Sequence, residues 1–236
     1  MFGWKDKKNT GPARNAELSK AMDGLLITGQ AGFVAGTHVA SNLGWRAVEA
    51  LSLGDKVLTF DHGMQTIVDI QSETLFAPEN ALPLAQCPVL VPQGAMNNRK
   101  DMWLMPDQGM LVESDAAIDA LGDPFAVVPA RVLKGLKGIQ STTPVDRLDV
   151  TTLAFANDEV IYVEGGMLAY CPRPRCILTE TLTTEDSLYD VLDTRRARFL
   201  VDCLIDENDA SPLLCDPEEL AGVVAKRARP TRPLMM

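Results

Sequence analysis

The stretch "GFVAGTHVASNLGWRAVEALSLGDKVLTFDHG", residues 32–63, constrains most strongly what this chain can fold into. Apolar and polar residues alternate in "GTHVAS" and again in "DKVLTF", which is the two-residue period of a β-strand with one buried face. Between these segments, "NLG" contains residue types that favour tight turns. The stretch therefore predicts short strands joined by tight turns.

The rest of the chain supports a mainly β fold. Fifteen prolines and seventeen glycines among 236 residues imply many turns, which favours short strands over long helices. Further strands are predicted within residues 65–75, 87–96, 101–114 and 125–135, the last followed by a brief helix or turn. Residues 146–166 are expected to form a hairpin that turns at Asn157 and Asp158.

The pattern changes after Cys171. The prolines of "CPRPRC" cannot donate backbone hydrogen bonds, so they end any strand there. The sequence pattern of residues 184–205 does not show whether this region forms a helix or a strand. A helix is predicted over about 217–228, because Asp216 can cap it, Pro217 suits its first position and Pro230 stops it.

Charge and cysteine content limit the classes of function. The net charge of −10 disfavours a nucleic-acid-binding protein, although the first 14 residues carry a net +3 and residues 226–232 a net +4, which leaves weak nucleic-acid contact through the termini open. Five cysteines without a secretory signal indicate reduced thiols in the cytoplasm, and export without such a signal stays open. No apolar run approaches the roughly 20 residues that a membrane-spanning helix needs.

The same stretch contains a long ordered motif. The motif opens with Phe-x-x-Gly-Thr and continues as "V-E-x-L-x-x-G-D-x-V-L-T-x-D-x-G". The matching residues are Phe33, Gly36, Thr37, Val48, Glu49, Leu51, Gly54, Asp55, Val57, Leu58, Thr59, Asp61 and Gly63. This motif resembles the opening of Hint domains, the fold of hedgehog C-terminal domains and inteins, and most closely their stand-alone bacterial branch. "MPDQGMLV", "FAVVPARVL" and "TTLAFANDEVIYVEGG" resemble later family motifs.

The resemblance implies a fold and a division of the chain. Hint domains are mainly β, a pseudo-symmetric horseshoe of short strands. We accordingly predict a flexible basic arm over residues 1–29, a Hint-like domain over 30–170, and a mixed α/β C-terminal extension over 171–236 that ends in the helix of about 217–228.

The resemblance also implies a chemistry that this chain is missing. Active members begin with a Cys or Ser that attacks the preceding peptide carbonyl, but Gly32 stands at that position. Gln108 and Thr152 stand where the family has histidines, and Asp158 replaces a further one. A glutamine does not titrate near neutral pH, so it cannot protonate a leaving nitrogen. These degenerate positions predict that no catalytic residue remains.

Two functions follow from this pattern. The first is a non-catalytic module that binds a protein partner through its surface. The alternative is residual autoproteolysis near Ala31–Gly32, with Thr37 or His38 recruited in place of the missing residues. For His38 the favoured interpretation is a structural strand histidine, exposed or with its hydrogen bonds satisfied.

No cofactor or metal is expected. "CPRPRC" supplies two thiols, but zinc needs two more ligands at a suitable spacing. The acidic segment 206–219 lacks the ligand order and the central glycine of a calcium loop. For His62, in "FDHGMQ", a turn residue that tolerates positive φ is at least as good an interpretation as a functional histidine.

Overall fold

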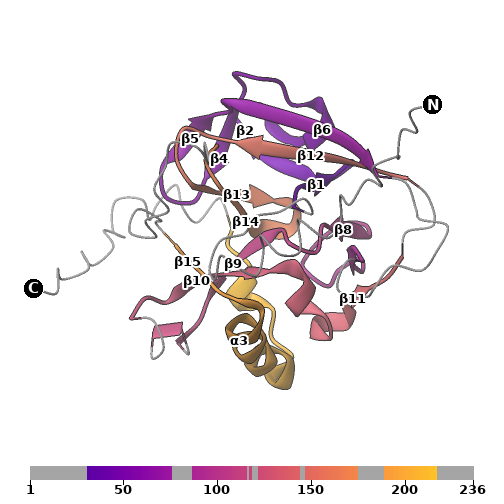
Figure 1. Cartoon of the computed structure of the whole chain (residues 1–236), viewed down its shortest axis with the longest axis vertical. Helices are drawn as coiled ribbons and strands as arrows, with labels where there is room; N and C mark the ends of the chain where they lie inside the picture. Colours follow the sequence, from indigo (N-terminus) through magenta and orange to yellow (C-terminus); the bar gives the residue numbers. More distant parts are fainter. Residues whose placement is uncertain are drawn as a thin grey trace, which may run out of the picture.

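The computed structural model describes residues 31–75, 87–115, 117–118, 122–143, 147–174 and 189–216, and within them the fold is mainly β, as predicted. Strands of the described residues form two sheets, neither of which closes on itself (Figure 1). The first sheet has six strands in the order β11-β7-β8-β1-β12-β6. Its strands are β1 (Phe33–Val34), β6 (Asp69–Leu75), β7 (Val89–Val91), β8 (Met102–Leu104), β11 (Gln140–Ser141) and β12 (Leu148–Ala154).

The second sheet has nine strands, eight of which follow the order β15-β10-β9-β14-β13-β2-β4-β5, while the ninth, β3, pairs with β2. Its strands are β2 (His38–Ser41), β3 (Gly44–Ala47), β4 (Lys56–Thr59), β5 (Gly63–Thr66), β9 (Gly109–Glu113), β10 (Phe125–Pro129), β13 (Glu159–Val163), β14 (Met167–Cys171) and β15 (Asp190–Val191). The predicted strand segments between residues 32 and 135 are therefore confirmed, including the brief helix η3 (Ala130–Leu133) after β10.

The hairpin predicted for residues 146–166 is wrong. Both strands exist, but β12 pairs with β1 and β6 in the first sheet, whereas β13 pairs with β14, β2 and β4 in the second. Every residue of β13 is buried, as suits a strand in the middle of a sheet with both faces covered, while β12 has exposed positions. The four residues between them carry the chain from one sheet to the other.

Of the undecided region 184–205, residues 184–188 lie outside the described residues, and the remainder contains strand β15 and most of the helix α3 (Thr194–Glu207). The Asp193 side chain caps α3 by accepting hydrogen bonds from the backbone N–H groups of Arg195 and Arg196. Asn208 ends it with a positive φ of 49°. The helix buries Ala197, Leu200, Val201 and Leu204, and it lies at the end of the molecule opposite β6 (Figure 1).

Part of the predicted extension thus packs on the β sheets, because β15 pairs in parallel with β10 and the buried face of α3 joins the main hydrophobic core. The division at residue 170 stays a prediction. The arm over 1–29 and the helix over about 217–228 lie outside the described residues.

No helix of the described segments is both long and apolar enough to span a membrane.

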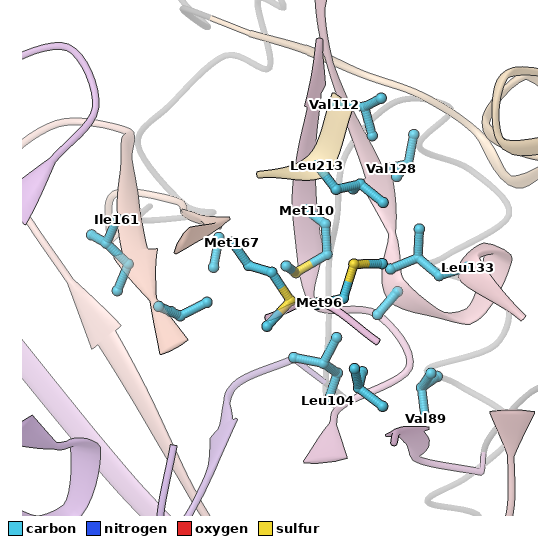
Figure 2. Packing of buried hydrophobic residues seen from close by; sticks show 14 of the residues in the cluster. Val89, Met96, Leu104, Met110, Val112, Val128, Leu133, Ile161, Met167 and Leu213 are labelled. Atoms are coloured by element: carbon cyan, nitrogen blue, oxygen red, sulfur yellow. The ribbon is translucent and has the colours of Figure 1, made fainter. Parts of the chain in front are cut away.

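Methionines fill the centre of the core. Figure 2 shows Met96, Met110 and Met167 converging between Ile161 on one side and Leu133 on the other. These three methionines are at most 1% exposed and come from three separate parts of the chain. Flexible thioether side chains fill irregular gaps, and full burial of one contributes about 1.5–3 kcal/mol. The core therefore joins segments that are far apart in the sequence.

Gly165 marks the closest approach between two of these segments. Gly165 lies in the short 3-10 helix η5 (Glu164–Gly166) with φ +81°, and a Cβ there would sit 1.9 Å from the carbonyl oxygen of Met96. The Asn98 side chain fixes the facing loop by accepting from Met96 N and donating to the carbonyl oxygens of Val91, Pro92 and Lys100. Only glycine fits at residue 165.

We predict that Gly165→Ala lowers the free energy of unfolding by about 3 kcal/mol or more, because backbone strain and a backbone clash add together. Urea denaturation followed by circular dichroism measures this. Gly54→Ala is the matched control, since Gly54 has φ +90° with no atom within 4 Å of the added Cβ, and it should cost only about 1–2 kcal/mol. Equal losses in the two variants would contradict the close approach.

Candidate functional site

The peptide bond between Ala31 and Gly32 is held by one side chain. The Gly32 N–H donates to Oε1 of Gln108 at 3.1 Å, in a buried hydrogen bond. The Nε2 group of Gln108 donates to the carbonyl oxygens of Gly109, at 3.1 Å, and Tyr170, at 2.9 Å. Because two acceptors face the nitrogen and one donor faces the oxygen, the orientation of the amide is determined. Gln108 therefore presents an acceptor, with no proton to give, to the Gly32 nitrogen.

The space beside Gly32 is already filled. Gly32 has φ +134°, and a Cβ at this position would lie 2.6 Å from Cγ1 of Val150 and 3.1 Å from Oγ1 of Thr152. Both residues belong to β12, the strand that pairs with β1. The structure thus brings together the three positions that the sequence singled out, Gly32, Gln108 and Thr152. A Cβ at residue 32 would require the Val150 side chain, or the backbone that carries it, to shift.

The turn that carries Gln108 is fixed from several sides. The Gln108 N–H donates to the Met105 carbonyl, and the Gln108 carbonyl accepts from Ala130 N. Asp107 forms an ion pair with Arg131. Burial raises the pKa of the Asp107 carboxyl and the neighbouring Arg131 only partly offsets this rise. These contacts hold the Gln108 side chain against Gly32 without help from a ligand.

The two alternative candidates lie in different surroundings. Thr37 is only 3% exposed, and its backbone N–H and carbonyl are bonded to Val34 and Val48. Nδ1 of His38 lies 3.2 Å from Oε2 of Glu164, and the imidazole is 38% exposed while the carboxylate is 10% exposed. The bonds of His38 therefore lead to η5 rather than to the Gly32 amide.

His38 and Glu164 line a cavity that sequence reasoning missed. Its volume is about 590 Å³. Other lining residues come from distant parts of the chain: Trp45, Asn97, Arg99, Glu113, Gly165, Gly166, Leu214, Cys215 and Asp216. Oε1 of Glu164 accepts from the Arg99 N–H, which orients this carboxylate. The only signal in the sequence was the Glu-Gly pair in "IYVEGG", which matched a family motif without a stated role.

The remaining candidates have structural contacts. Asp158 accepts from the backbone N–H of Arg173 at 2.8 Å and so fixes the chain after β14. His62 is not merely a turn residue, since its Nδ1 lies 2.9 Å from Oε2 of the buried Glu159. Burial and the neighbouring Glu159 raise the pKa of the Cys171 thiol, so this sulfur stays protonated. Cys176, the second cysteine of "CPRPRC", lies outside the described residues.

No three His, Cys, Asp or Glu side chains converge as a metal site in the described parts of the chain.

The family of this chain follows from a comparison with family models. A model described as "Hint domain" matches residues 31–169, which is more than half of the chain. The chain belongs to the Hint domain family. The matched region begins at Ala31, immediately before the glycine whose amide Gln108 holds.

Solved structures with a similar shape share little sequence with this chain. A bacterial intein-like domain from Clostridium thermocellum is 14% identical, and the match covers 60% of this chain and 98% of that domain with a TM-score of 0.43. The gp41-1 intein is 11% identical, with 59% and 98% covered and a TM-score of 0.37. The Msm DnaB1 intein splicing domain, solved with zinc bound, is 11% identical, with the same coverages and a TM-score of 0.35. No curated protein matches the sequence.

We predict that Gln108→Glu, which preserves the shape of the side chain, lowers the free energy of unfolding at pH 7 by about 3 kcal/mol. The introduced carboxylate would face the Gly109 and Tyr170 carbonyl oxygens in a buried site. Burial and these oxygens raise the pKa of the introduced carboxyl in the folded state, so the loss should shrink as the pH falls towards 4. Denaturant unfolding at both pH values measures the difference.

Gln140→Glu, on the exposed position of β11, is the matched control and should change little at either pH. A Gln108→Glu variant whose stability loss did not depend on pH would contradict the assignment of Nε2 to the two carbonyl oxygens.

Proposed function

We propose that this Hint domain performs no self-cleavage and acts through its surface as a protein-interaction module. The observation that carries the proposal is the hydrogen bond from the Gly32 N–H to Gln108 Oε1. Cleavage of an amide needs a nucleophile at the carbonyl and a proton for the leaving nitrogen. Residue 32 has no side chain, and Gln108 offers its nitrogen partner a lone pair instead of a proton.

The filled space beside Gly32 supports the same conclusion. Val150 and Thr152 occupy the volume that a nucleophilic side chain on residue 32 would need. Protein interiors are close-packed, and here the side chains of Val150 and Thr152 pack beside Gly32. The site is therefore packed as core rather than kept open for a reaction.

The surface supports an interaction role. Large apolar side chains that are more than 40% exposed recur within residues 43–68, namely Leu43, Trp45, Leu53, Met64 and Val68. Phe199 on α3 is 72% exposed. Single exposed apolar residues are ordinary, and these residues are the ones available for contact with another protein.

Residual autoproteolysis remains the competing function. It would need Thr37 or His38 to reach the Ala31 carbonyl. Thr37 is buried in backbone contacts and His38 is engaged with Glu164, so neither serves this role without a rearrangement.

We predict that the full chain with a tag at each end keeps a single intact mass through overnight incubation, with or without dithiothreitol or hydroxylamine. Both reagents cleave thioesters or esters, so an intermediate at Ala31–Gly32 would release two fragments. Intact-mass spectrometry reads the result directly. Fragments that break at Ala31–Gly32 would overturn the proposal, and Thr37→Ala and His38→Ala would then show which residue acts.

A further inference from the structure

We propose that the open edge of β3, with the cavity beside it, binds an extended basic segment of a partner protein. The main chain of the segment adds to β3 as a further strand, and a Lys or Arg side chain enters the cavity lined by Trp45 and Glu164. This inference rests on the proposed function, because it names the surface and the partner chemistry of the interaction.

The edge of β3 is available for pairing. Within the part of the chain that the structure describes, β3 pairs only with β2, so its other side has no strand beside it. In natural proteins, charged side chains, prolines or bulges often prevent such an edge from pairing with another chain. Here Arg46 is the single charged residue of β3, and its guanidinium is held at the Ala50 carbonyl and Asp55. Trp45 is 47% exposed on this edge, and Leu43 just before it is 70% exposed.

The register of β2 and β3 places the cavity on one face of this edge. His38 lies opposite Ala47 and Ala40 lies opposite Trp45, so these four residues share a face. His38 and Trp45 both line the cavity. Side chains of an added strand alternate between its two faces, so every second one would point to the cavity side.

The charge of the cavity selects a cation. Among the described residues that line it, the carboxylates of Glu113 and Glu164 lie with the guanidinium of Arg99, and Glu164 is also paired with His38. Glu164 is held in place by His38 and by the Arg99 backbone N–H, so its negative charge is positioned before a ligand arrives. The Trp45 ring adds an aromatic face, which attracts ammonium and guanidinium groups. The cavity volume of about 590 Å³ lies in the range of small-ligand sites and accommodates a long basic side chain.

The test uses the full chain and fluorescence anisotropy of a labelled nine-residue peptide. Lysine occupies alternate positions of this peptide, with threonine or valine between them, so that all lysines share one face when it is extended. The matched peptide carries glutamate in place of each lysine. We expect the lysine peptide to bind at least about tenfold more tightly than the glutamate peptide, and its binding to weaken as salt is raised.

Two variants and two controls locate the contact. Trp45→Ala should weaken binding of the lysine peptide at least about tenfold, since exposed tryptophans are frequent hot spots. Glu113→Gln should weaken it about threefold and reduce its salt dependence. Phe199→Ala removes a more exposed aromatic ring from α3, and Glu73→Gln removes an exposed charge from β6. Both should leave binding within about twofold of the original.

The inference is overturned if the lysine peptide does not bind, if the glutamate peptide binds as tightly, or if Phe199→Ala weakens binding as much as Trp45→Ala does. Self-association of the chain without peptide, abolished by Trp45→Ala in sedimentation, would assign the edge to a second copy and also overturn it. The mass of each preparation is recorded in the same experiment. An intact chain that fails to bind refutes this inference alone, whereas a chain cleaved at Ala31–Gly32 refutes the proposed function.

Discussion

The carboxamide of Gln108 is the contact on which the rest of the arrangement depends. It joins Gly32, which leads into β1 of the six-stranded sheet, to Tyr170 of β14 in the nine-stranded sheet. A buried amide that accepts from one sheet and donates to two carbonyl oxygens of the other links the sheets only while both ends are satisfied. Loss of either end would leave polar groups buried without partners, so the two sheets and the Ala31–Gly32 bond share one network.

The same network explains how a site for chemistry can become a site for packing. A catalytic group must be free to change its protonation or its bonding partner during a reaction. Gln108 has no such freedom, because each of its polar atoms has a fixed partner. Val150 and Thr152 then complete the packing at Gly32. What stabilises this part of the fold is therefore also what keeps it chemically inactive in our proposal.

Much of this could be predicted from the sequence, and the failures have physical causes. Alternation and turn residues predicted the strands from Phe33 to Val128, and the motif match singled out Gly32, Gln108 and Thr152, which the fold brings together. The period of a strand does not say which strand it pairs with, so β12 and β13 were assigned to one hairpin although they belong to different sheets. The α3 helix was undecided although Asp193 and Asn208, at its two ends, are residue types that favour helix ends. The cavity could not be predicted, because it gathers residues from His38 to Asp216.

The passage of the chain from β12 to β13 has a consequence for folding during synthesis. Strands β13 and β14 lie between β9 and β2 in the nine-stranded sheet, yet they are made after both. A growing chain that has reached Ala154 has every strand of the six-stranded sheet but lacks the middle of the other one. The apolar faces of the strands on either side of this gap, β9 and β2, stay exposed until residues up to Cys171 leave the ribosome. Non-local pairing of this kind is slow and prone to aggregation, so the nascent chain passes through its most vulnerable stage just before β13 is completed.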